Sequence, residues 1–374
     1  MKHFSFFLTL LLLTACTGEP ESGPAPGGGQ TQTQEFYVPG VFRIKLRETA
    51  AELNTRAFTR SGYGSGIAAF DAAATRAGAT GVQRVFSDGD RFRERRRRAG
   101  LHLWYDVHFS GAISVEEAME RFGRVDEIEC IEPVPRMVPA GTTVVQAGVG
   151  PYSTAGSGNA ASPGFDDPLL VNQWLYHREG SAVGSTAVAD LNIFPAWSVS
   201  TGHKDVIVAV VDGGIDYTHP DLAANIWRDE QGACGYNFCR HNTEITPSSH
   251  GTHVAGTVGA VNNNGIGVCG IAGGDGTPGS GVRLMSCQIF DEPEHGAATI
   301  EEIMVWTADH GAVISQNSWA YVPGLPDLSQ SGKAAIDYFI EYAGCDENGN
   351  QTGPMKGGIV IFAAGNDGIS DPVF

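Results

Sequence analysis

The chain lacks any hydrophobic run long enough to cross a bilayer as a helix. A spanning helix needs about 20 apolar residues, and the longest such run, from Phe4 to Leu13, is much shorter. Charged residues make up only 18% of the 374 residues and hydrophobic residues 42%. This balance is typical of folded globular proteins and excludes disordered and fibrous classes. At roughly 150 residues per domain, the length favours two domains with connecting segments.

Basic residues are scarce, with 24 Lys and Arg against 42 Asp and Glu. Residues 36–139 hold 16 basic and 14 acidic side chains, a net of +2, whereas residues 140–374 hold 7 and 25, a net of −18. The one dense basic cluster, Arg93–Arg98, lacks the interleaved aromatic residues of a nucleic-acid-binding module. We therefore predict no nucleic-acid partner and a solvated loop at this cluster. Two other interpretations are a site cut by a trypsin-like protease and a surface that faces the acidic domain.

Cysteine is also sparse, with seven residues. No second pair at ligand spacing supports a zinc site, so we interpret the cysteines after Cys16 as structural. Cys234 and Cys239 are close enough in sequence to close a short disulfide loop in an exported chain, although connectivity does not follow from sequence. The six cysteines beyond Cys16 are Cys130, Cys234, Cys239, Cys269, Cys287 and Cys345.

The N-terminus predicts export. A basic start, a short apolar run and small residues form a secretion signal over residues 1–16. Leu13-Thr14-Ala15-Cys16 resembles a bacterial lipoprotein box, in which Cys16 becomes the lipidated first residue; the alternative is an ordinary signal peptide with an incidental cysteine. Residues 17–35, rich in Gly, Pro, Gln and Thr, predict a flexible tether. We expect a protein of the bacterial cell envelope, anchored to the membrane only by lipid, or a secreted one.

Residues 36–139 predict a small α+β domain. Residues 37–46 and 101–109 alternate apolar and polar side chains, as half-buried strands do. Residues 114–122 have helical spacing behind a Ser-x-x-Glu start that resembles a capping box. A further strand is expected over residues 125–133.

Residues 140–164 predict a linker, because they are Gly, Ser, Thr, Ala and Pro with almost no charge. Residues 165–374 follow, and their strands are apolar runs typical of strands buried on both faces. Alternation of such runs with helices predicts a parallel α/β sheet. The expected strands are 206–211, 282–289, 312–316 and 358–363, and the expected helices are 253–261, 299–310 and 333–342.

Two motifs carry the chemistry. Asp212 directly follows the apolar strand, at the carboxyl end where parallel α/β sheets place their sites. His250 precedes Gly251 and Thr252 and then a helix, which places its imidazole at a helix start above closely packed backbone. A metal site at His250 and His253 is disfavoured, because the spacing of three residues without a Glu does not match the HExxH scheme.

Residues 210–222 and 250–258 resemble, in this order, the Asp and His motifs of subtilisin-like serine proteases. Asp212 and His250 stand 38 residues apart, against roughly 30 in subtilisin, and an insertion that holds Cys234 and Cys239 accounts for the excess. The resemblance implies a subtilisin-like parallel sheet with helices on both faces. It also implies a serine-type endopeptidase that acts on proteins and peptides and needs no cofactor for the chemistry. Asp212 would orient His250, and His250 would act as general base and then as acid.

Two further segments resemble this family. Asn317, Ser318 and Trp319 match the segment that pairs with the substrate backbone and lines the specificity pocket, although Ala320 stands where the family usually has Gly. Residues 361–368 are similar to the segment that supplies the oxyanion-hole donor, which implies this role for Asn366. Such a donor contributes about 3 to 4 kcal/mol in the transition state.

The family often binds calcium near the His helix, and oxygen-only ligands suit this hard cation. The loop over residues 261–268 is one residue longer than usual, so a structural calcium ion remains a hypothesis. The matching ligands are the side chains of Gln173, Asp221 and Asn263 and the carbonyls of Val261, Ile266 and Val268.

The family's nucleophile lies in a Gly-Thr-Ser-x-Ala motif about 160 residues beyond the His. Only 124 residues follow His250, and no Gly-Thr-Ser occurs in the sequence. We therefore expect a peptidase domain that is incomplete at its C-terminus and folds poorly alone. Because loss of the triad serine costs on the order of 10⁶ in turnover, we expect this chain to be inactive.

Residues 36–139 loosely resemble the family's propeptide, by their position and by the ending Glu129–Pro133. The resemblance implies an intramolecular inhibitor and folding aid, and opposite net charges favour its docking. Two other functions stay open. One is a pseudoprotease at the cell surface that binds peptides without cutting them, and the other is a chaperone or inhibitor in residues 36–139 that acts on other proteases.

Overall fold

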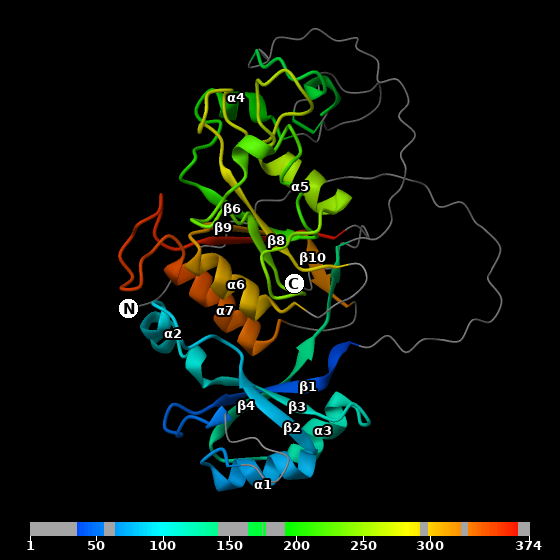
Figure 1. Ribbon diagram of the computed structural model, residues 1–374, viewed down its shortest axis with the longest axis vertical. Helices are drawn as coiled ribbons and strands as arrows, with labels where there is room; N and C mark the ends of the chain where they lie inside the picture. Colours follow the sequence, from blue (N-terminus) through cyan, green and yellow to red (C-terminus); the bar gives the residue numbers. More distant parts are fainter. Residues whose placement is uncertain are drawn as a thin grey trace, which may run out of the picture.

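The computed structural model describes residues 36–55, 64–140, 164–173, 175–176, 191–291, 298–322 and 328–365. The signal segment with Cys16, the tether and Asn366 lie outside these residues, as does nearly all of the predicted linker. The described chain forms a four-stranded antiparallel sheet and a five-stranded parallel sheet, and a two-stranded pairing connects the two units (Figure 1). No helix among the described residues is long and apolar enough to cross a membrane.

The first unit has strand order β2-β3-β1-β4, and every neighbouring pair is antiparallel. Its β-α-β-β-α-β order carries one extra short helix, α2, between β2 and β3. Helices α1 and α3 cover one face of the sheet (Figure 1). The elements are β1 (Tyr37–Leu46), α1 (Ala68–Ala77), β2 (Ala79–Arg84), α2 (Arg93–Arg98), β3 (Trp104–Phe109), α3 (Val115–Phe122) and β4 (Ile128–Pro135).

Helix α3 begins as the sequence predicts. The Ser114 hydroxyl accepts a hydrogen bond from the Glu117 amide at 3.1 Å, which satisfies one of the unpaired N–H groups of the first turn. The Glu117 carboxylate pairs with Arg121 at 2.6 Å, so only half of the capping box forms. The strand predicted over residues 101–109 starts at Trp104, because Leu101–Leu103 form a 3₁₀ turn.

Successive side chains of β1 point alternately to the two faces of the sheet, and the two faces have different surroundings. Phe42 and Ile44 point into the core under α1 and α3, and Arg43 therefore points to the opposite face. The sequence predicts a half-buried strand there, but the side chain of Arg43 is only 1% exposed. The prediction is wrong for this face, because Arg43 bonds to residues of the second unit that lie against it.

The second unit has strand order β11-β9-β6-β8-β7, all parallel. Val208 and Val210 of β6 pack in one core with Ala255 of α5. Ala209 and Val211 pack in another core with Ile303 of α6, so helices cover both faces as predicted. The elements are α4 (Ile193–Trp197), β6 (Ile207–Asp212), β7 (Gly235–Asn237), α5 (Ser249–Gly259), β8 (Arg283–Gln288), α6 (Ile300–Asp309), β9 (Ile314–Asn317), β10 (Trp319–Tyr321), α7 (Gln330–Tyr342) and β11 (Ile359–Phe362).

The two units meet along α6 and α7 (Figure 1). Phe86, Leu101 and Trp104 of the first unit belong to the same apolar core as residues of α6 and α7. Beside this contact, Arg95 and Arg96 of α2 are 0% and 6% exposed and pair with Asp309. The predicted solvated loop at Arg93–Arg98 is therefore wrong, and the basic cluster is a helix that faces the acidic domain.

The short disulfide loop considered for Cys234 and Cys239 is not formed, since Cys234 is a buried free thiol. Burial raises the pKa of this thiol, which keeps it protonated and unreactive.

Candidate active site

Asp212 is the last residue of β6, the central strand of the parallel sheet. The strands β8 and β7 lie on one side of β6 and the strands β9 and β11 on the other. In parallel α/β sheets, ligands bind beyond the carboxyl ends of the strands where the order reverses. The Asp212 carboxylate therefore stands where this class of sheet places its sites.

Three glycines allow the segment after Asp212 to pack against the start of α5. A Cβ atom on Gly213 would lie 2.2 Å from Ser248 Oγ, one on Gly214 would lie 2.1 Å from a backbone carbonyl oxygen, and one on Gly251 would lie 2.2 Å from the Gly213 carbonyl oxygen. No side chain fits at such distances. The predicted close backbone packing beneath His250 is therefore real, and it brings His250 to Asp212.

Asp212 and His250 form a hydrogen-bonded pair. His250 Nδ1 lies 2.8 Å from Oδ1 and 2.9 Å from Oδ2 of Asp212. The carboxylate is buried, whereas half of the His250 side chain is exposed. The hydrogen bond that His250 Nδ1 donates to the Asp212 carboxylate raises the pKa of His250, and the Asp212 charge adds to this effect while burial opposes it. With Nδ1 held by the carboxylate, Nε2 is the nitrogen left to exchange a proton with a substrate.

The predicted substrate segment lies beside this pair. The Ser318 amide donates to the carbonyl of Val211 at 3.3 Å, so residue 318 is next to the end of β6. Asn317 is fully buried, and its side chain bonds to backbone carbonyls of Ser315 and Ile361 and accepts from the Trp319 indole at 3.0 Å. The Asn317 side chain therefore holds this segment in place through its hydrogen bonds. The backbone of Ser318 and of β10 forms a strand edge that can pair with another strand.

That edge carries a strand of the chain itself. β5 (Met137–Pro139) pairs antiparallel with β10, with Pro139 opposite Trp319 and Met137 opposite Tyr321. The Ala140 amide extends the ladder by donating to the Ser318 carbonyl at 3.1 Å. The sequence analysis does not predict this strand, because residues 137–139 look like an ordinary domain end. The only sequence signal for the pairing is that the segment Met-Val-Pro, directly before the predicted linker, is apolar.

Asn366 lies outside the described residues. The Ala363 amide, three residues before it, donates to the Asn317 carbonyl at 2.9 Å. The backbone after β11 therefore leaves the sheet beside the substrate segment, and the role of Asn366 stays a prediction.

The predicted calcium ligands are only partly brought together. Asp221 is buried, its Oδ2 accepts from the Val268 amide at 2.9 Å, and its Oδ1 accepts from the side-chain amide of Asn264 at 2.8 Å. Asn263 is exposed, has φ of +55° and donates instead to the Asp275 carbonyl at 3.3 Å. Asn264, and not Asn263, is therefore the asparagine of this loop whose side chain contacts Asp221. Gln173 lies at the end of the same loop, where Oε1 accepts from the Cys269 amide at 2.8 Å.

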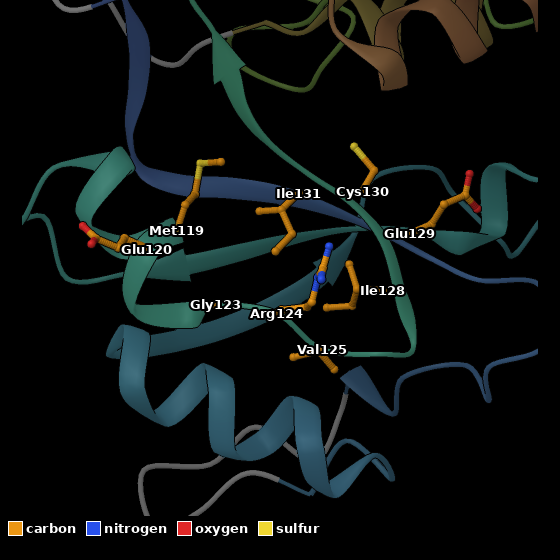
Figure 2. A pocket seen from close by; sticks show the side chains of 9 residues that line it. All are labelled: Met119, Glu120, Gly123, Arg124, Val125, Ile128, Glu129, Cys130 and Ile131. Atoms are coloured by element: carbon orange, nitrogen blue, oxygen red, sulfur yellow. The ribbon is translucent and has the colours of Figure 1, made fainter.

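Within the described ranges, no three His, Cys, Asp or Glu side chains gather as metal ligands. A pocket lies elsewhere, between α3 and β4 of the first unit (Figure 2). Its wall includes Met119, Val125, Ile128 and Ile131, and it holds no residue of the Asp212 and His250 pair. The Asp212 and His250 pair therefore lies outside this pocket, at the end of β6 and near Ser318.

Comparison with known proteins agrees with this geometry. Residues 203–373 match the subtilase family, peptidase family S8. Neuroendocrine convertase 2 of Bos taurus is 29% identical over 221 residues, 55% of this chain and 30% of that protein. Fervidolysin of Fervidobacterium pennivorans is 31% identical over 178 residues, 46% of this chain and 22% of that protein. The dibasic-processing endoprotease of Yarrowia lipolytica is 31% identical over 209 residues, 55% of this chain and 19% of that protein. The chain thus spans less than a third of the length of these relatives.

The crystal structure of fervidolysin, described as a keratinolytic enzyme related to subtilisin, matches with a TM-score of 0.52 at 22% identity. The match covers 83% of this chain and 39% of that chain. This likeness shows the subtilisin-like fold that the sequence predicts.

Proposed function

Because residues 203–373 are similar to the subtilase family, we propose that the protein is the precursor of a serine endopeptidase. The observation that carries the proposal is the Asp212 and His250 pair, held at 2.8 Å at the carboxyl end of the central strand and next to an edge that accepts a peptide strand. A metal-independent hydrolysis of peptide bonds is the chemistry that this arrangement supports.

In the proposed reaction, His250 takes the proton of a serine hydroxyl as that oxygen attacks the peptide carbonyl. The Asp212 carboxylate stabilises the imidazolium and keeps Nε2 directed at the substrate. His250 then gives the proton to the leaving amine, and a water molecule releases the acyl group by the same steps. Asn366, carried over from the family resemblance, would donate to the oxyanion.

A serine-directed fluorophosphonate probe tests the proposal on the expressed gene product, together with hydrolysis of casein. We expect labelling and hydrolysis in the wild type and their loss in His250→Ala, since triad variants lose up to about 10⁶ in turnover. His253→Ala is the matched control, because His253 is an exposed histidine of the same helix, and it should retain both. Absence of labelling and hydrolysis in the wild type would remove the endopeptidase proposal.

We further propose that residues 36–139 act as an intramolecular inhibitor. The support is that the strand following this unit covers the edge of β10, where a substrate would add its own backbone hydrogen bonds. A substrate and this strand exclude each other.

The second candidate function is peptide binding without cleavage. It is favoured by the same pairing, since a backbone ladder along β10 needs no nucleophile. This function would replace the first if the wild-type protein binds a fluorescent peptide but neither reacts with the fluorophosphonate probe nor hydrolyses casein.

Export and lipid anchoring at Cys16 are also proposals, supported by the lipoprotein-box resemblance. Fractionation of cells that express the wild type or Cys16→Ser tests them. We expect the wild type in the membrane fraction and the variant released from it; equal distribution of the two would favour an ordinary signal peptide.

A further inference from the structure

Residues Met137–Ala140 pair with the edge of β10 as the backbone of a bound peptide would. They run antiparallel to β10, with Met137, Val138 and Pro139 opposite Tyr321, Ala320 and Trp319. The ladder has a hydrogen bond at each end, from the Val322 amide to the Arg136 carbonyl at 3.2 Å and from the Ala140 amide to the Ser318 carbonyl at 3.1 Å. The whole tetrapeptide is therefore held by backbone bonds in one register.

The direction of β5 carries its carboxyl end toward the catalytic pair. Moving from Met137 to Ala140, the partner residue changes from Tyr321 to Ser318. Ser318 bonds to Val211, the residue before Asp212. Among the described residues of this strand, Ala140 is therefore the one that pairs beside the end of β6.

The residues beside this strand pairing are apolar. Met137 and Tyr321 pack against the apolar core that the two units share. Trp319 is buried and its ring contacts those of Tyr321 and Phe362 at centroid distances of 5.5 and 5.3 Å. These surroundings fit a peptide with uncharged residues before the cleaved bond and an apolar side chain at the fourth position before it.

We infer that the peptide bond after Ala140 is the maturation bond of this precursor, and that the site prefers uncharged peptides with a small residue before the cleaved bond. This inference rests on the proposed endopeptidase function. A serine hydroxyl would form an ester with the Ala140 carbonyl carbon as the C–N bond breaks, and His250 would protonate the leaving amine. Water would then hydrolyse the ester, leaving a carboxylate on Ala140 and the free serine.

The alternative comes from the name of one relative, a dibasic-processing endoprotease. Cleavage of that kind would point to the run Arg95–Arg98, which is the densest basic sequence of the chain. In the structure this run is helical, and Arg95 and Arg96 are buried against Asp309. The arginine run is thus unavailable as an extended substrate, whereas Met137–Ala140 is already extended along the edge of β10.

Expression of the gene and N-terminal sequencing of the mature protein test the position. We expect a mature N-terminus at residue 141. Ala140→Asp should slow its appearance about tenfold or more, because a charge must be desolvated at the site. The same change in the predicted linker, Ala155→Asp, should have no effect. An N-terminus elsewhere, or equal processing of both variants, would overturn the inference.

A pair of peptide amides with a chromogenic leaving group tests the preference on the mature enzyme. We expect kcat/KM for Met-Val-Pro-Ala to exceed that for Met-Val-Arg-Arg by at least about tenfold. A preference for the dibasic peptide would refute the inferred specificity while leaving the endopeptidase proposal intact. Loss of fluorophosphonate labelling and of cleavage of both peptides would instead count against the endopeptidase itself.

Discussion

The Asp212 carboxylate changes the proton affinity of His250. The hydrogen bond and the nearby negative charge both favour the imidazolium, so the pKa of His250 lies above its ordinary value. A general base works only when it is neutral. Proteolytic activity should therefore be lost as the pH falls through this raised pKa.

Asp212→Asn tests this coupling. The variant keeps the shape of the side chain but removes the charge, and kcat should fall about 10⁴-fold, as for the corresponding change in other triads. The residual activity should extend to lower pH, because the pKa of His250 returns toward its ordinary value. The pH dependence of kcat/KM reports these ionisations in the free enzyme. An acidic limb at the same pH in both proteins would show that Asp212 does not act on His250.

At the scale of the element, helix α2 connects the two units through buried hydrogen bonds and ion pairs. The Arg95 guanidinium donates to the Tyr338 hydroxyl at 2.6 Å and to the Cys345 carbonyl at 2.8 Å, in addition to its pair with Asp309. The Tyr338 hydroxyl in turn donates to Asp309 at 2.7 Å. Every charge in this buried cluster therefore has several partners.

Removal of one partner should be costly. We expect Arg95→Ala to lower the free energy of unfolding of the precursor by about 3 to 5 kcal/mol, because it leaves Asp309 with an incompletely compensated buried charge. Arg93→Ala is the matched control: the Arg93 side chain is half exposed and pairs with Asp88 at 3.2 Å within its own unit, so its effect should stay within about 1 kcal/mol. Urea unfolding followed by tryptophan fluorescence measures both free energies of unfolding. Equal decreases in the two variants would show that Arg95 does not stabilise the contact between the units.

The loop after α5 is a second element with a testable role. We propose that it binds calcium through Gln173, Asp221 and the carbonyls of Val261, Ile266 and Val268, as the family resemblance implies. Calcium at 100 times its dissociation constant would stabilise the fold by about 2.7 kcal/mol. The melting temperature of the wild type should be higher with calcium than with a chelator. The melting temperature of Asp221→Asn should be the same under both conditions. Asp205→Asn, at an exposed carboxylate, should behave as the wild type; no calcium shift in the wild type would end this proposal.

At the scale of the whole molecule, a second buried cluster links the units. Arg43 contacts Asp106 at 2.7 Å within its own sheet and Glu301 of α6 at 2.6 Å across the interface. Glu132 of β4 accepts hydrogen bonds from the Gln330 and Ser331 amides at 2.8 and 3.0 Å. A carboxylate of the first unit thereby satisfies the N-terminus of α7 in the second.

This interface should weaken in acid. Burial acts to raise the pKa of Glu301, but the Arg43 charge and hydrogen bonds from Ser331 and Arg43 outweigh it, and the pKa lies below the ordinary value of 4.5. A group with a lowered pKa in the docked state stabilises docking above its free pKa and loses that contribution as the pH falls through the lowered value. The first unit should therefore loosen from the second below about pH 4.5.

Separation of residues 36–140 from the rest after cleavage, followed by gel filtration between pH 6 and 3, measures this release. Glu301→Gln should weaken the association at neutral pH and flatten its dependence on acid. Glu341→Gln, at an exposed position of α7, should leave both unchanged. An association that is constant over this pH range would rule out Glu301 as the acid-sensitive contact.

The sequence by itself determined the features that depend on neighbours along the chain. Apolar runs predict the strands β6, β8, β9 and β11, because strands buried on both faces need such runs. Ser114 predicts the start of α3 through a local cap. The motifs around Asp212 and His250 predict a site at a strand end and a helix start, since their glycines allow close backbone packing.

Only the tertiary structure decided features that depend on distant partners. From the sequence alone, Arg95 is predicted to be a solvated charge. In the fold it is paired with Asp309, which lies 214 residues further along the chain. Contact of Asp221 with Asn264 instead of Asn263 depends on how the loop after α5 folds against Asp221. The pairing of Met137–Pro139 with β10 joins two short segments whose own propensities predict nothing. Burial and hydrogen bonding are properties of contacts, and a contact between distant residues exists only once the chain has folded.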